Sequence, residues 1–151
     1  MRISSRFPVA VQIMMIITAL SGTRKINSKT LSEGIGVNAV IIRNIFKDLK
    51  QANMISVSPG PGGATLARAP ETISLWEILI AVEQMDTDDV FRLTKQPDEH
   101  HQIARNIYGL LGAHLDTSID AMKSELSKIS LLTMAEELHD CMPELPPLPN
   151  T

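Results

Sequence analysis

The chain has 151 residues, 44% of them hydrophobic and 21% charged, which fits one soluble globular domain, alone or with an extension. A single cysteine, Cys141, excludes an intrachain disulfide and a cysteine-built zinc site, and indicates a reducing compartment. The net charge of −3 hides a division, because residues 1–68 carry +7 and residues 69–151 carry −10. A polyanion would therefore meet the first part, and the acidic part would face away from it.

Residues 8–20 are apolar nearly throughout and follow two arginines. Basic residues ahead of such a run resemble a secretory signal, but Gln12 interrupts it and it is too short to span a bilayer. We interpret it as a helix buried on several sides, with Pro8 in its first turn and Ser5 as its N-cap.

Two helices joined by a glycine turn are predicted next. Ser28 is expected to cap a helix over residues 29–35, and Asn38 is expected to cap a helix over residues 39–51. The second helix has an apolar stripe at helical spacing, formed by Ile42, Ile45, Phe46 and Leu49. Its opposite face carries side chains that can reach phosphates and base edges, namely Arg43, Asn44, Lys47, Lys50 and Gln51. A polar face is also typical of any surface helix.

A hairpin is predicted after these helices, with strands over residues 54–58 and 64–68. The tip between them contains two prolines and three glycines, which suit neither a helix nor a β-ladder. Beside a helix that contacts the base edges of DNA, the bare backbone amides of Gly60, Gly62 and Gly63 could approach a phosphate. The alternative is that the tip is an ordinary connecting turn. A P-loop is not expected, because its lysine and Ser/Thr are absent. The order of these elements is that of a winged helix-turn-helix.

Residues 70–72 predict a linker, and Thr72 or Ser74 is expected to cap a helix over residues 75–85, with Trp76 at a domain junction. The acidic residues 86–89 lack the ligand spacing of a calcium loop. His100 and His101 are neighbours that point about 100° apart on a helix, so we expect surface histidines rather than a metal site.

A long helix is predicted over residues 108–130. Its apolar residues recur at spacings of three and four, a seam that lets two helices pack lengthwise: Leu111, Leu115, Ile119, Met122, Leu126 and Ile129. We interpret it as a dimerisation helix, although packing within one chain produces the same stripe. A short last helix is predicted over residues 131–140, and the proline-rich segment from Met142 is expected to be extended or disordered.

Four segments together carry a family resemblance: Gly36-Val-Asn38, Phe46-Lys-Asp-Leu49, Gly60-Pro-Gly-Gly63 with Leu66, and Ile73 to Glu83. They resemble the Rrf2 family of winged-helix transcription regulators, which includes the iron–sulfur regulator IscR and the cysteine regulator CymR. The resemblance runs from Arg2 to about Glu83, and more loosely to about Leu132. It implies a homodimeric DNA-binding regulator. Cluster-binding members have three cysteines in the region matching residues 90–101, where this chain has none, so we expect no cluster.

The resemblance also implies DNA contacts. Members often have a Ser-x-x-Tyr-Leu-Glu pattern at the start of the reading helix, which matches residues 38–43 here, with Ile41 at the tyrosine position and Arg43 at the glutamate position. Arginine favours guanine or phosphate where glutamate favours cytosine. Pro59 stands where the wing often has an arginine. The candidate DNA contacts are Ser28, Lys29, Asn38, Ala39, Ile41, Arg43, Asn44, Lys47, Lys50, Gly60, Gly62 and Gly63.

The sequence thus predicts a mainly α-helical fold with a small β-hairpin: a winged helix-turn-helix domain over residues 1–85, dimerisation helices over residues 86–140 and a flexible tail over residues 141–151. The expected function is a sequence-specific transcription regulator, a repressor that binds double-stranded DNA in the cytoplasm as a homodimer. No cluster, metal, other cofactor or membrane contact is expected. No nucleophile–base pair at catalytic spacing indicates an enzyme. The alternative is a winged-helix interaction module that holds a partner enzyme through its acidic part.

Overall fold

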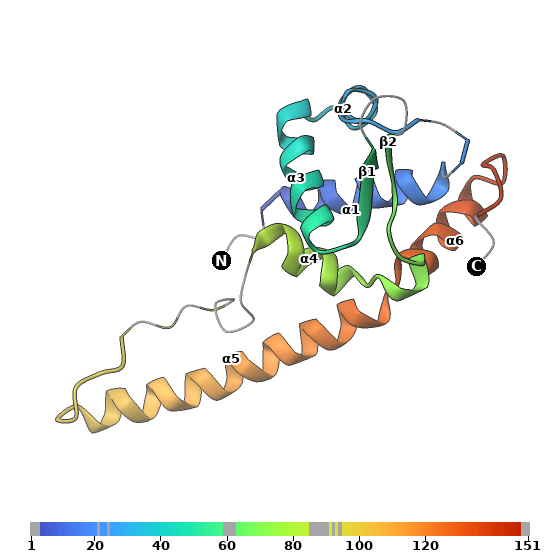
Figure 1. The fold of residues 1–151 in the computed structure, drawn as a ribbon. Helices are drawn as coiled ribbons and strands as arrows, with labels where there is room; N and C mark the ends of the chain where they lie inside the picture. The colour runs from blue at the N-terminus through green and yellow to red at the C-terminus, as the bar shows by residue number, and fades with distance from the viewer. Residues whose placement is uncertain are drawn as a thin grey trace.

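The computed structural model describes residues 4–20, 22–23, 25–58, 63–84, 91, 93 and 95–148. Figure 1 shows a body of short helices around a two-stranded hairpin, with one long helix below it. In chain order the elements are α1 (Arg6–Ala19), α2 (Ser28–Ile35), α3 (Ala39–Gln51), β1 (Ile55–Ser58), β2 (Gly63–Leu66), the 3-10 helix η1 (Pro70–Thr72), α4 (Leu75–Glu83), α5 (Gln102–Lys128) and α6 (Leu131–Cys141). The predicted mainly α-helical fold with one small hairpin is confirmed.

Helix α1 forms the centre of the core. Its side chains at Ala10, Ile13, Met14 and Ile17 are fully buried, and it contacts α4, α6 and β2 as well as the helix-turn-helix pair. The interpretation as a buried helix is confirmed. Ser5 occupies the predicted N-cap position, but its side chain makes no capping hydrogen bond. None of the helices in the described part of the chain is long and apolar enough to cross a membrane.

The helix-turn-helix pair begins one residue earlier than predicted. Asn27, not Ser28, caps α2, because its extended backbone lets Oδ1 accept from the backbone N–H groups of Lys29 and Thr30, both at 3.0 Å. Ser28 is the first residue of the helix. The helix ends at Gly36, whose φ of +77° is the left-handed conformation that glycine adopts without strain.

Helix α3 has the predicted bounds and the predicted cap. The side-chain oxygen of Asn38 accepts from the N–H of Val40 at 2.8 Å. The predicted apolar stripe is buried, at Ile42, Ile45, Phe46 and Leu49. This stripe fixes which face of α3 is turned outward.

The hairpin pairs β1 and β2 antiparallel, from Ile55 opposite Leu66 to Ser58 opposite Gly63. Both strands are shorter than predicted. Of the predicted tip at residues 59–63, residues 59–62 lie outside the described residues and Gly63 is the first residue of β2. Gly63 has a φ of +73°, and a Cβ atom there would lie 2.7 Å from the carbonyl oxygen of Ile26. The same oxygen accepts from the N–H of Ala64 at 2.7 Å. The start of β2 is therefore fixed against the loop that precedes α2.

The predicted linker after the hairpin is the 3-10 helix η1, whose Thr72 hydroxyl donates to the carbonyl of Ala69 at 2.7 Å. Ser74 caps α4 in a capping box with Glu77, so the Ser74 alternative is the correct one. Helix α4 ends at Glu83, and Gln84 follows in the left-handed conformation with φ of +52°. Trp76 is buried.

Helix α5 begins at Gln102, six residues before the predicted start, and contacts α4. Its N-terminal half projects beyond the body (Figure 1). Two backbone hydrogen bonds join its C-terminal end to the start of α4: Leu75 N–H to the Ile129 carbonyl at 3.0 Å and Leu131 N–H to the Ile73 carbonyl at 2.8 Å. Helix α6 then turns back onto α1 and η1.

The helices predicted to form a separate dimerisation part, over residues 86–140, pack against helices of the first part. Of the two helices assigned to dimerisation, α5 contacts α4 and α6 contacts α1. The expected boundary at residue 85 lies outside the described residues. The tail from Met142 to Leu148 has no regular secondary structure.

Candidate DNA interface

The outer face of α3 is cationic and exposed. Its members Arg43, Asn44, Lys47, Lys50 and Gln51 are all solvent-exposed, as the spacing predicted. Figure 1 shows α3 beside the hairpin, on the opposite side of the body from α6. A helix of 13 residues with one exposed face fits the width of a DNA major groove.

The first turn of α3 is polar at its cap and apolar beyond it. Asn38 is exposed and Ala39 is half-buried, whereas Val40 and Ile41 are 52% and 45% exposed. Val40 was not among the predicted contacts, although Ala39 and Ile41 on either side of it were. Helix N-termini carry a partial positive charge, which suits a nearby phosphate.

Helix α2 braces α3 and adds charge beside it. The two helices contact each other, Lys29 is exposed near the start of α2, and Ser28 is half-buried. Lys25 is exposed in the loop just before α2. The exposed cations thus come from that loop and from both helices of the pair.

One acidic residue on α3 faces inward. Asp48 is only 7% exposed, and its carboxylate accepts hydrogen bonds from the Arg6 guanidinium on α1 and from Gln84 Nε2 at 3.0 Å. Next to Gln84, Glu83 accepts from the Ser4 hydroxyl at 2.7 Å. The two bonds to Asp48 tie α3 to the beginning of α1 and to Gln84, which directly follows α4. The sequence could not reveal them, since the two partners lie 42 and 36 positions from Asp48.

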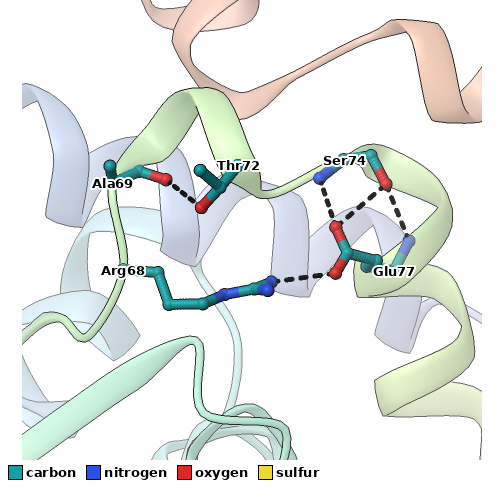
Figure 2. Close-up of polar contacts among 5 residues, drawn as sticks. All are labelled: Arg68, Ala69, Thr72, Ser74 and Glu77. Carbon is teal, nitrogen blue, oxygen red and sulfur yellow. Dashed lines mark hydrogen bonds and ion pairs between the residues drawn. The ribbon is translucent and has the colours of Figure 1, made fainter.

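The chain after β2 is held by a second polar cluster. Figure 2 shows Arg68 reaching Glu77 on α4, with Ser74 on the other side of the same carboxylate. Arg68 Nη2 donates to Glu77 Oε1 at 2.9 Å, and the Ser74 N–H donates to Oε2 at 3.0 Å. Partial burial alone would raise the pKa of Glu77, but the Ser74 N–H and then Arg68 stabilise the carboxylate and lower the pKa below its ordinary value. The link connects the hairpin to the first turn of α4.

The three glycines predicted as phosphate contacts have different positions. Gly60 and Gly62 lie outside the described residues. Gly63 is buried against the backbone of Ile26. The structure therefore gives Gly63 a packing role at the base of the hairpin, because no larger residue fits there.

The predicted dimerisation residues differ in exposure. Leu111 is exposed, Ile119 is 8% exposed and thus buried within its own chain, and the others are half-buried: Leu115, Met122, Leu126 and Ile129. A different apolar surface is open to solvent in the projecting half of α5. It is formed by Ile103, Ile107, Leu110 and Leu111, with Ile103 79% and Leu110 65% exposed. His100 and His101 adjoin it and, with Ile103 and Ile107, line an open hollow of about 560 Å³.

Comparison with known proteins places these features in a family. The Rrf2 family profile, described as an iron-dependent transcriptional regulator, matches residues 3–137. YwnA of Bacillus subtilis (strain 168), named as an HTH-type transcriptional regulator, is 28% identical over 136 residues, which are 90% of this chain and 98% of that protein.

Solved structures show the same fold. IscR of T. potens superimposes with a TM-score of 0.70 at 17% identity, covering 94% of this chain and 91% of that one. CymR (YrzC), named the global cysteine regulator of B. subtilis, gives a TM-score of 0.66 at 18% identity, covering 91% and 98%. At these identities the similarity establishes the fold.

Because the family profile is described as iron-dependent, the next question is whether the side chains of this chain could hold an iron–sulfur cluster. Iron–sulfur clusters are held mostly by cysteine thiolates, and the one cysteine here, Cys141, is exposed at the end of α6. Across the residues that the structure describes, no three His, Cys, Asp or Glu side chains are grouped closely enough to hold a metal ion. The residues present do not fit a cysteine-bound cluster.

Proposed function

The chain belongs to the Rrf2 family and is a DNA-binding transcription regulator, and we propose that it acts as a homodimer whose two α3 helices enter major grooves of one duplex. The observation that carries the proposal is that the outer face of α3 exposes Arg43, Lys47 and Lys50, whereas the only acidic residue of the helix, Asp48, is buried on its inner side. Counterion release on phosphate neutralisation would supply most of the affinity.

Individual residues on this face have distinct tasks. Arg43 reads a guanine edge or holds a phosphate, and Asn44 suits an adenine edge. Lys47 and Lys50 neutralise phosphates along the groove, and Lys29 with Ser28 contacts the backbone from α2. Further contacts come from the start of α3 and from the wing, at Asn38, Ala39, Ile41, Gly60, Gly62 and Gly63.

Dimerisation uses the projecting half of α5. Ile103, Ile107, Leu110 and Leu111 repeat at spacings of four, three and one, so they share one face of the helix. A contiguous exposed apolar face is typical of a protein interface. A second copy of α5 covers this face, with Leu111 and Leu115 continuing the seam toward the body. Ile119 supports the interface from inside its own subunit.

The dimer works in the cytoplasm as a repressor that occludes its promoter. The acidic second part of the chain faces away from DNA, since its net charge of −10 would be repelled by phosphates.

Selection from a random duplex pool at low salt tests this function. The expected result is an enriched pseudo-palindrome whose half-sites lie about 34 Å apart, or a multiple of that spacing. A pool that shows no enrichment would overturn DNA reading by α3 and favour the interaction-module alternative.

A further inference from the structure

Val40 is the most exposed apolar side chain of α3, with 52% of its surface open to solvent. Single exposed aliphatic residues are common on protein surfaces and need no explanation by themselves. This one lies on the first turn of the helix that carries the cationic face. Its neighbours decide what it can contact.

The position of Val40 on the helix follows from the α-helical period of 3.6 residues. Val40, Asn44, Lys47 and Gln51 are separated by four, three and four residues, so they form one line along α3. All four side chains are exposed. The line lies opposite the buried stripe of Ile42, Ile45 and Leu49, which makes it the outermost line of the helix.

We propose that Val40 packs against the 5-methyl group of a thymine in the major groove, so that each half-site of the operator requires a thymine at one fixed position. This inference rests on the proposed role of α3 as the reading helix. In helix-turn-helix proteins the first residues of that helix approach the base edges. A valine side chain has no hydrogen-bonding group, and the thymine methyl is the apolar group that the major groove offers.

The charges around Val40 favour DNA over a protein as its partner. Arg43 and Lys47 are exposed on the same outer face, one turn and two turns further along α3. Lysine is depleted at protein–protein interfaces, so Lys47 beside Val40 argues against a protein partner there. Cations on this face would bind phosphates of a duplex and hold the first turn of α3, with Val40, against the base edges of the groove.

The size of the effect follows from the surface that one methyl group buries. A buried methyl or methylene contributes enough to change an equilibrium about four-fold. Losing the contact in both half-sites of a dimeric complex would weaken binding by more than ten-fold.

The test uses the full-length protein and the duplex enriched from the random pool. Each thymine is replaced in turn by deoxyuridine, which lacks the methyl group and keeps the same hydrogen-bonding edge. Binding is expected to weaken about four-fold at one thymine per half-site and to stay unchanged at the others. Val40→Ala changes both subunits, so it should weaken binding to the thymine duplex by more than ten-fold and should be indifferent to deoxyuridine at that position. The variant should fold, because the site is exposed and alanine is a good helix former.

Val57→Ala is the matched control, since it truncates an exposed valine of β1 outside the reading helix. It should keep the sensitivity of the wild type to deoxyuridine. A flat deoxyuridine profile for the wild type, or the same sensitivity in Val40→Ala, overturns the inference while the proposed function stands. Failure of the wild type to bind any duplex overturns both.

Discussion

Arg43 lies on the exposed face of α3, at the position where the family resemblance implies a frequent glutamate. Its exposed guanidinium can make two parallel hydrogen bonds to a guanine. Arg43→Ala should weaken binding to the selected duplex by about 1–3 kcal/mol, with a smaller loss on a scrambled duplex. Fluorescence anisotropy titrations on both duplexes measure this difference. Equal affinities of variant and wild type would remove Arg43 from the interface.

Glu77 gives the stability of the chain a pH dependence that can be isolated. Its lowered pKa means that the charged form is favoured by folding, so the contribution is present above the ordinary glutamate pKa and is lost as the pH falls through the lowered one. Glu77→Gln keeps a residue that can complete the capping box but removes the ion pair with Arg68. At pH 7 it should cost about 0.5–1 kcal/mol, since both partners are partly exposed.

Urea unfolding of Glu77→Gln and the wild type, at one protein concentration and at several pH values, measures this effect. The two free energies of unfolding should converge as the pH falls below the ordinary glutamate range. A difference that persists unchanged in acid would show that the Arg68 ion pair is not its source.

At the scale of elements, α3 is held by a buried carboxylate as well as by its apolar stripe. Asp48→Ala would leave Arg6 and Gln84 without their acceptor. It should lower the free energy of unfolding by about 1–3 kcal/mol, because an unpartnered polar group stays behind. Asp48→Asn keeps one acceptor oxygen for Gln84 and should cost less. Urea midpoints measure both variants, and an unaltered midpoint for Asp48→Ala would contradict the anchoring role.

The cationic face of α3 sets how binding responds to salt. Replacing Lys47 or Lys50 by alanine should flatten the plot of log affinity against log salt by about one unit per subunit, because one phosphate contact is lost. Lys123→Ala, at an exposed position of α5, is the control and should leave the slope unchanged. A wild-type slope in both α3 variants would rule out phosphate contacts there.

The elements that sequence predicted well are those set by local spacing. The bounds of α3, its Asn38 cap and its buried stripe follow from residues within one turn of each other. Helix α5 starts earlier than predicted, and Ile103 and Ile107 in its first turns extend, at a spacing of four, the stripe that was predicted to begin at Leu111. The anchoring role of Asp48 and the packing role of Gly63 became visible only in the structure, because both depend on partners far away in the chain.

At the scale of the whole molecule, the proposed dimer would depend on the projecting half of α5. Leu110→Glu places a charge in the centre of its exposed apolar face and should convert the dimer to a monomer, because a buried unpaired charge is costly. Sedimentation velocity measures the change. Lys123→Glu, in the half of α5 nearer the body, should remain dimeric. A dimeric Leu110→Glu protein would place the interface elsewhere.

The periodicity of the sequence predicted an apolar stripe along α5. It could not tell which part of the stripe packs within its own chain and which part is exposed to solvent. A stripe that packs on α4 and a stripe that is open to solvent have the same spacing. The fold separates them, since Ile119 is buried in its own chain whereas Leu110 is exposed. The division of charge, in contrast, needs no knowledge of the fold, because it follows from counting the charged residues in each part of the sequence.

The number of protein chains on one selected duplex, measured with the binding affinity by analytical ultracentrifugation in dilute salt, tests the account most directly. Two chains are expected on each pseudo-palindromic duplex, with an affinity that falls steeply as salt rises. A protein that stays monomeric and binds no duplex under these conditions would contradict it.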